Sequence, residues 1–198
     1  MSTETQKVPV MIYTEATPNP ATLKFVLNRP LFPNDYYEFE NINDTENAPL
    51  AKALFEIDGV IGVFISNNFV TISKNEDWMW VELMPSIKEF LKNYLGDEQP
   101  VFTEDFKKTN RKATNEIGAD DSDVEVKIKG VLEQYVKPAV EMDGGAISFV
   151  SFEEGVLTLA LQGSCSGCPS STVTLKDGIE NLMKRMVPQV QSVVAMND

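Results

Sequence analysis

The first half of the chain alternates short apolar runs with turn residues, a pattern typical of β-strands. Asn67 and Asn68 separate two of these runs and predict a hairpin, because asparagine tolerates positive φ. A rigid turn is expected at residues 17–20, where two prolines lie close together. The expected strands cover residues 8–14, 22–28, 36–39, 60–66 and 69–73.

Two helices are expected among these strands. Pro49 opens the first helix and Gly59 ends it. Pro85 fits only the first turn of the second helix, because proline lacks the N–H that a helix interior uses. That helix places apolar residues at helical spacing, namely Leu83, Ile87, Phe90 and Tyr94. The sequence therefore predicts a small α+β domain over residues 1–96.

The second half predicts the order helix, strand, strand, helix, strand. Its first helix begins near Val124 with Asp123 as N-cap, and Pro138 should kink or end it. Gly144 and Gly145 are read as turn glycines before the first strand. Strands are expected at 147–152, 156–161 and 190–195, and the second helix repeats Leu175, Ile179, Leu182 and Met186 on one face. We expect a second α+β domain at 123–198, with both helices on one face of a small sheet, joined to the first by an acidic linker at 97–122.

Both cysteines of the chain, Cys165 and Cys168, lie three residues apart at the corner between an expected strand and an expected helix. Pro169 suits the first turn of that helix, whose early amides should lower the pKa of the two thiols and favour thiolates. The small neighbours Ser164, Ser166 and Gly167 should leave the sulfurs accessible and offer hydrogen-bond donors. The pair is therefore placed for chemistry.

Three kinds of chemistry fit a cysteine pair, and the residues alone leave them open. A thiol–disulfide oxidoreductase usually carries its motif after the first strand of a βαβ unit, whereas this motif lies late in a short domain. Structural zinc needs four ligands, and the chain contains no histidine. A cubane iron–sulfur cluster needs four thiolates, so one chain supplies half of them. Such a cluster would require two copies of the chain and should be easy to transfer.

The charge and the apolar runs exclude other classes of function. Seventeen basic and 30 acidic residues give a net charge of −13, which argues against nucleic-acid binding. No apolar run reaches the ~20 residues that a membrane span needs. The opening residues resemble neither a secretory signal nor a transit peptide, so a cytoplasmic location is expected. An organellar protein that has already lost its presequence would fit the same residues.

Segments in both halves of the chain resemble a known family. Residues 163–180 and the earlier 142–145 closely resemble the C-terminal domain of NifU and the Nfu proteins. Residues 14–25 and 49–60 are similar to the N-terminal domain of Nfu proteins. Together the two resemblances cover nearly the whole chain, and their order along it is the expected one.

The resemblance implies an iron–sulfur cluster scaffold or carrier rather than an enzyme. It implies a 4Fe–4S cluster bridged between two protomers of a homodimer by Cys165 and Cys168 of each, and delivery to apo iron–sulfur proteins. It leaves open a two-iron form and a supply of cluster from an upstream scaffold. The first domain would then select or hold client proteins. Ser164, Ser166 and Gly167 would surround the cluster and tune it.

Overall fold

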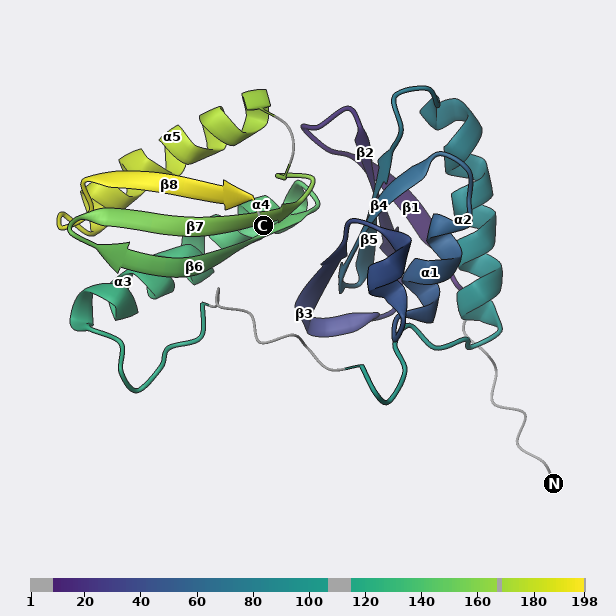
Figure 1. Cartoon of the computed structure of the whole chain (residues 1–198), viewed down its shortest axis with the longest axis horizontal. Helices are drawn as coiled ribbons and strands as arrows, with labels where there is room; N and C mark the ends of the chain where they lie inside the picture. Colours follow the sequence, from purple (N-terminus) through teal and green to yellow (C-terminus); the bar gives the residue numbers. More distant parts are fainter. Residues whose placement is uncertain (1–8, 107–114, 167–168, 198) are drawn as a thin grey trace. The chain divides into compact units, whose positions relative to one another are not determined.

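The computed structural model describes residues 9–106, 115–166 and 169–197, without the side chains of 34, 169–172 and 197. The chain divides into two compact units, one of Met1–Glu15 with Phe25–Phe106 and one of Ala16–Lys24 with Lys107–Asp198. Each unit combines helices with its own β-sheet (Figure 1), so the α+β fold class expected from the sequence is confirmed. In the described residues, no helix is both long and apolar enough to cross a membrane.

The first unit is built on a five-stranded sheet in the order β1-β2-β5-β4-β3. In chain order its elements are β1 (Ile12–Ala16), β2 (Thr22–Leu27), β3 (Phe32–Phe39), the 3₁₀ turn η1 (Ile42–Thr45), α1 (Pro49–Phe55), β4 (Val60–Asn67), β5 (Phe69–Lys74) and α2 (Trp80–Gly96). The hairpin expected at Asn67 is confirmed, since Asn67 has φ +33° and Ser66 pairs with Phe69. β1 begins later and β3 earlier than the apolar runs indicated.

Two expectations about helix ends in this unit are wrong. α1 ends at Phe55, and Gly59 instead forms the turn into β4 with φ +91°, where a Cβ would lie 2.6 Å from Cγ of Trp78. α2 begins at Trp80, so Pro85 lies inside the helix rather than in its first turn. Pro85 is exposed to solvent. The buried stripe of α2 is Leu83, Ile87, Leu91 and Leu95.

The start of the expected linker packs on the first unit. The rings of Phe102 and Phe106 lie 4.6 Å and 6.1 Å from the ring of Phe32 between centroids. Phe106 also meets Tyr37 edge-on at 5.2 Å. These contacts extend the first unit beyond the end of α2, over β3.

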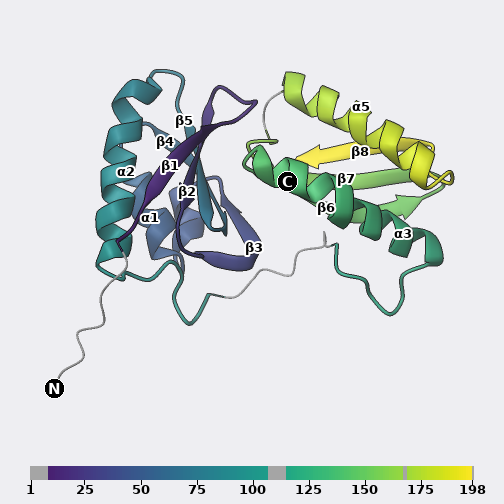
Figure 2. The ribbon, with the colours of Figure 1, turned by 180° about the vertical axis from the view of Figure 1, so that it is seen from behind.

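The second unit has the element order expected from the sequence. It contains α3 (Asp123–Val131), the π-helical segment η2 (Leu132–Val136), α4 (Lys137–Met142), β6 (Gly145–Glu153), β7 (Val156–Gly163), α5 (Pro169–Met186) and β8 (Ser192–Asn197). β6 and β7 are antiparallel, and β7 and β8 are parallel. The helices all lie on one face of this sheet, as Figures 1 and 2 show from opposite sides.

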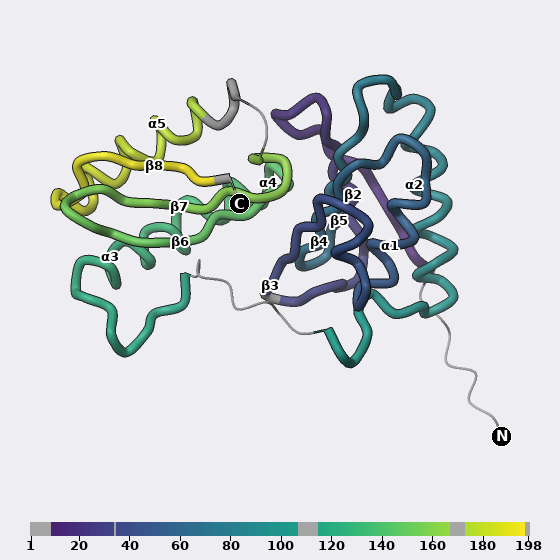
Figure 3. The backbone as a smooth tube through the Cα atoms, in the orientation of Figure 1, coloured from purple at the N-terminus to yellow at the C-terminus, as the bar shows by residue number. Residues whose placement is uncertain are grey.

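The first helical path of this unit differs from expectation at its start, and of the kink or end expected at Pro138 the structure excludes only the end. Ser122, not Asp123, is the N-cap of α3, where its side chain and that of Glu125 form a capping box. Pro138 does not end the path, which continues through η2 into α4 (Figure 3). The N–H of Lys137 donates to the carbonyl of Leu132, five residues back, and Pro138 then falls within the first turn of α4, where proline is tolerated.

The helices and the sheet enclose one core in this unit. Fully buried members include Ile128, Leu132, Val140, Leu157, Leu159, Met183 and Val187. In α5, Ile179 is buried and Leu175 and Leu182 pack at the margin, whereas Met186 is 44% exposed. The expectation that Met186 belongs to the buried face is therefore wrong, because Met183 takes that place one turn earlier.

Candidate cluster-binding site

The loop that carries Cys165 leaves the sheet at the joined ends of β6 and β7. Gly145, the first residue of β6, pairs with Gly163, the last residue of β7. Gly144 and Gly163 adopt φ of +82° and +72°, a conformation that favours glycine. The interpretation as turn glycines is therefore confirmed for Gly144 but wrong for Gly145, which is a strand residue without positive φ.

Four hydrogen bonds hold the start of the loop, two of them to residues directly after α4 and two within the loop. The N–H of Ser164 donates to the carbonyl of Gly144 at 3.2 Å, and the Ser164 hydroxyl donates to the carbonyl of Asp143. Ser166 donates to the carbonyl of Gly163 through its N–H at 3.1 Å and its hydroxyl at 2.8 Å. The backbone on both sides of Cys165 is thereby fixed by residues from two parts of the sequence. We call these four bonds the loop clasp.

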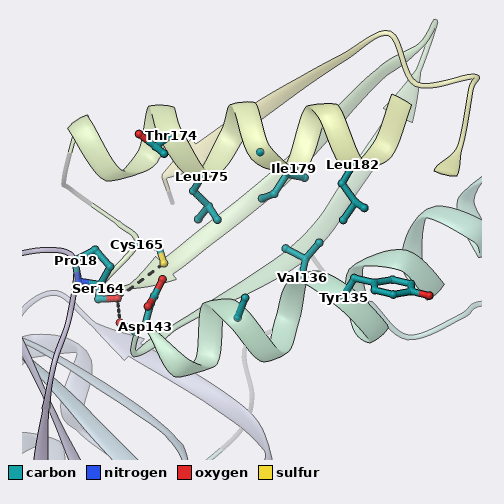
Figure 4. Close-up of a pocket in the computed structure, with 12 residues that line it drawn as sticks. Pro18, Tyr135, Val136, Asp143, Ser164, Cys165, Thr174, Leu175, Ile179 and Leu182 are labelled. Carbon is teal, nitrogen blue, oxygen red and sulfur yellow. Dashed lines mark hydrogen bonds between the residues drawn. The ribbon is translucent and has the colours of Figure 1, made fainter. Parts of the chain in front are cut away.

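Cys165 is buried, with 7% of its surface exposed, and it belongs to the core of the second unit. Its Sγ lies 3.9 Å from the Ser164 hydroxyl (Figure 4). The small neighbours therefore do not leave this sulfur open to solvent, contrary to the expectation from the sequence. They do place a hydroxyl within hydrogen-bond range of sulfur.

The other half of the predicted pair lies outside the described residues. Gly167 and Cys168 are not described, nor are the side chains of 169–172. The roles of Cys168 and Gly167 accordingly stay predictions. Among the residues that are described, no group of three or more histidine, cysteine, aspartate or glutamate side chains could hold a metal ion.

An apolar groove runs between the two helical paths of the second unit and reaches Cys165. Figure 4 shows Asp143, Ser164 and Cys165 at one end and Tyr135 with Leu182 toward the other. Its middle is lined by apolar side chains and small residues of α4, η2 and α5, namely Val136, Ala139, Leu175, Gly178 and Ile179. The thiol of Cys165 is therefore approached along an apolar path. Asp143, whose carbonyl accepts from Ser164, closes α4 as its C-cap.

Comparison with known proteins places both halves of the chain in one family. Residues 12–98 match the family model described as "Scaffold protein Nfu/NifU N terminal", and residues 128–194 match the "NifU-like domain". The chain is 41% identical over 190 residues to "NifU-like protein 5, mitochondrial" of Arabidopsis thaliana, covering 95% of this chain and 68% of that relative. The chain belongs to the NifU-like family.

Two further proteins resemble the chain. The chain is 38% identical over 190 residues to "NFU1 iron-sulfur cluster scaffold homolog, mitochondrial" of Drosophila sechellia, covering 96% of this chain and 66% of the relative. A solution structure of a NifU-like protein from Saccharomyces cerevisiae aligns over 53% of this chain and 94% of its own, at 25% identity and a TM-score of 0.46. The chain thus spans about two thirds of the length of the curated relatives.

The sequence could indicate Cys165 but not what holds it. A cysteine three residues before another, followed by proline, is a local signal. The two Ser164 bonds of the loop clasp and the approach of Gly145 to Cys165 join residues 20 or 21 positions apart, and no local pattern encodes such contacts. The glycine pair at 144 and 145 is the one local signal of these contacts, but glycine pairs are also typical of turns, and both residues are predicted to be turn residues.

Proposed function

We propose that this NifU-like chain is a non-enzymatic iron–sulfur cluster carrier. Two copies hold one 4Fe–4S cluster through Cys165 and Cys168 of each copy, and the cluster is cargo passed to apo-proteins. The relatives named as iron–sulfur cluster scaffolds support the general role. The observation that carries the proposal is the buried, clasped Cys165 at the β7–α5 corner of a chain in this family.

The number of soft ligands supports sharing between copies. The chain has two cysteines and no histidine, whereas a cubane cluster takes four thiolates. Carboxylates are poor substitutes for thiolate in an iron–sulfur site. A second copy about a two-fold axis supplies the missing pair with the simplest oligomer symmetry.

The described residues supply orientation and hydrogen bonding. The loop clasp holds the backbone around Cys165, and the Cys165 thiolate is therefore already positioned when the cluster binds. The Ser164 hydroxyl, 3.9 Å from Sγ, can donate to the thiolate when it rotates away from the Asp143 carbonyl. α5 begins at Pro169, directly after the cysteine pair, and the positive end of its helix dipole favours an anionic cluster.

Delivery would proceed by ligand exchange, in which acceptor thiolates replace those of the carrier. The first unit contains no cysteine or histidine, so its role is to select or hold client proteins rather than to bind iron.

The matching relatives carry "mitochondrial" in their names, which supports an organellar location more than the cytoplasmic one expected from the opening residues.

The test is anaerobic reconstitution of the full chain with iron and sulfide. We expect a brown product with about two irons and two sulfides per chain and the mass of two copies. Cys165→Ala and Cys168→Ala should each lose the cluster and the dimer while circular dichroism and thermal unfolding show a folded chain. Wild-type uptake of zinc alone would favour a zinc module.

Two results would contradict the proposal directly. One is a Cys165→Ala or Cys168→Ala protein that still takes up iron and sulfide in stoichiometric amounts. The other is a holo-protein that is a single chain with its metal fully coordinated. Turnover of a protein disulfide by the metal-free chain would favour the oxidoreductase reading instead.

A further inference from the structure

Gly145 opens β6 directly beside the Cys165 thiol. A Cβ built on Gly145 would lie 2.9 Å from Sγ of Cys165 and 2.5 Å from the carbonyl oxygen of Gln162. Side-chain carbons in proteins essentially never come closer than 3.0 Å to such atoms, so any side chain at position 145 requires a neighbour to move. The sulfur occupies the space that this missing side chain leaves.

The need for glycine here comes from this close approach and not from the backbone angles. Gly144, one residue earlier, has φ +82°, which by itself favours glycine. Gly145 has no positive φ and pairs normally with Gly163 at the start of the β6–β7 ladder. Position 145 therefore requires glycine because the Cys165 sulfur and the Gln162 carbonyl oxygen pack closely against it.

The two contacting neighbours differ in how they can move. The Gln162 carbonyl belongs to the β7 backbone, opposite Ala146, so its movement disturbs the ladder. The backbone of Ser164 is held by the loop clasp, so the loop does not retreat easily. The Cys165 side chain turns about a single bond, and it is the group that can leave with the least disruption.

We propose that Gly145 is a positioning residue for Cys165. Because Gly145 has no side chain, it leaves a space that the sulfur occupies, which we call the seat of the sulfur. A side chain at position 145 expels the sulfur from this seat and moves it away from the Ser164 hydroxyl. For cluster binding the inference rests on the proposed function, because a displaced thiolate no longer lies where the loop clasp presents it. For the position of the thiol itself it needs only the geometry above.

Thiol reactivity of the metal-free chain tests the seat without any cluster. In a Cys168→Ser background, Cys165 is the single thiol, and its alkylation by iodoacetamide can be followed by mass spectrometry. We expect Gly145→Ala to react several-fold faster than the parent. The matched control is Gly130→Ala, because a Cβ at the exposed Gly130 has nothing within 4 Å and should leave the rate unchanged.

Lower stability alone would also speed alkylation, so a second control is needed. Leu157→Ala removes a fully buried side chain and leaves Gly145 intact. It measures how much of the rate comes from transient unfolding. The proposal is overturned if Gly145→Ala reacts no faster than Gly130→Ala, or no faster than Leu157→Ala after correction for the difference in unfolding free energy.

A double-mutant cycle covers the case in which Gly145→Ala folds poorly. If the sulfur is the group under strain, Gly145→Ala should lower the melting temperature less in a Cys165→Ala background, where Sγ is absent. Equal effects in both backgrounds overturn the proposal, as does failure to fold in both, because the Gln162 contact alone would then explain the loss.

The cluster provides the functional readout. After anaerobic reconstitution, Gly145→Ala should retain less iron and sulfide than Gly130→Ala and show an altered visible spectrum. Normal retention with an unchanged spectrum contradicts the inference. If the wild-type chain takes up no cluster, the proposed function fails, while the alkylation and cycle experiments still decide the role of Gly145.

Discussion

The ammonium group of Lys129 is buried inside the second unit and held from several sides. Only 5% of the Lys129 side chain is exposed. Its Nζ donates to the carbonyl of Glu116 at 2.9 Å and to both carboxylate oxygens of Asp121 at 2.9 Å and 2.7 Å. It also lies 5.0 Å from the centre of the Phe149 ring. A buried charge is tolerated only when it is paired in this way.

This pair predicts how stability depends on pH. The hydrogen bond from Lys129, with a further one from the Gly118 N–H, lowers the pKa of Asp121 below its usual value. A lowered folded-state pKa contributes stability above the unfolded pKa of about 3.9, and the contribution is lost as pH falls through the folded value. Asp121→Asn should therefore lower the free energy of unfolding at neutral pH, and the difference from wild type should shrink in acid.

Urea denaturation at a series of pH values from neutral into acid measures this difference as the Asp121 carboxylate becomes protonated. The control is Asp120→Asn, which changes the exposed neighbouring carboxylate and should follow the wild-type profile. A constant difference between Asp121→Asn and wild type at every pH would show that the Asp121 carboxylate is not titrating as described.

At the scale of elements, the order of helices and strands could be predicted from the sequence, but several boundaries could not. Alternation and the 3.6-residue period identify strands and helices because burial on one face imposes them. They do not reveal the π-helical segment Leu132–Val136, because one wider turn changes the apolar spacing too little to be recognised. Pro138 follows this segment, in the first turn of α4. Nor do they distinguish Ser122 from Asp123 as N-cap, because both are good caps and Glu125 decides through its bond to Ser122.

Gly178 lines the groove between α4 and α5, so a substitution there tests whether the groove is open in solution. A Cβ at Gly178 would have nothing within 4 Å, although the residue lies inside α5. Glycine in a helix interior is less favourable than alanine by about 1 kcal/mol. Gly178→Ala should therefore raise the free energy of unfolding by about that amount, measured by urea denaturation. A loss of stability would show that the groove closes in solution, so that the added carbon meets the opposite helix.

At the scale of the whole molecule, the segment between the two sheets is attached at both of its described ends. Residues 101–106 pack on β3 through Phe102 and Phe106. At the other end, the Asn115 amide donates to the carbonyl of Ile147 at 3.0 Å and accepts from the N–H of Phe149 at 2.8 Å. Asn115 thus pairs with β6, an edge strand of its sheet. The acidic linker at 97–122 stays a prediction, and its central residues 107–114 lie outside the described residues.

Composition alone could not foresee this attachment. The segment is charged and has few large apolar residues, which is typical of a tether. Its aromatic residues find partners in β3, some seventy residues earlier, and such long-range contacts leave no local pattern. α2 ends at Gly96, and the compact unit that contains it continues to Phe106. The domain boundary at residue 96 stays a prediction.

Phe106→Ala tests whether this part of the segment belongs to the first unit alone. The half-buried ring contacts Phe32, Tyr37 and Phe102, so its loss should destabilise that unit by roughly 1–2 kcal/mol. Hydrogen exchange followed by mass spectrometry should show faster exchange in β3 and β4 and unchanged exchange in β6 and β7. Ile117→Ala, which truncates a 62% exposed apolar residue of the same segment, should change neither. Equal acceleration in β6 and β7 would mean that the two units unfold together, and that residues 101–106 do not serve the first unit alone.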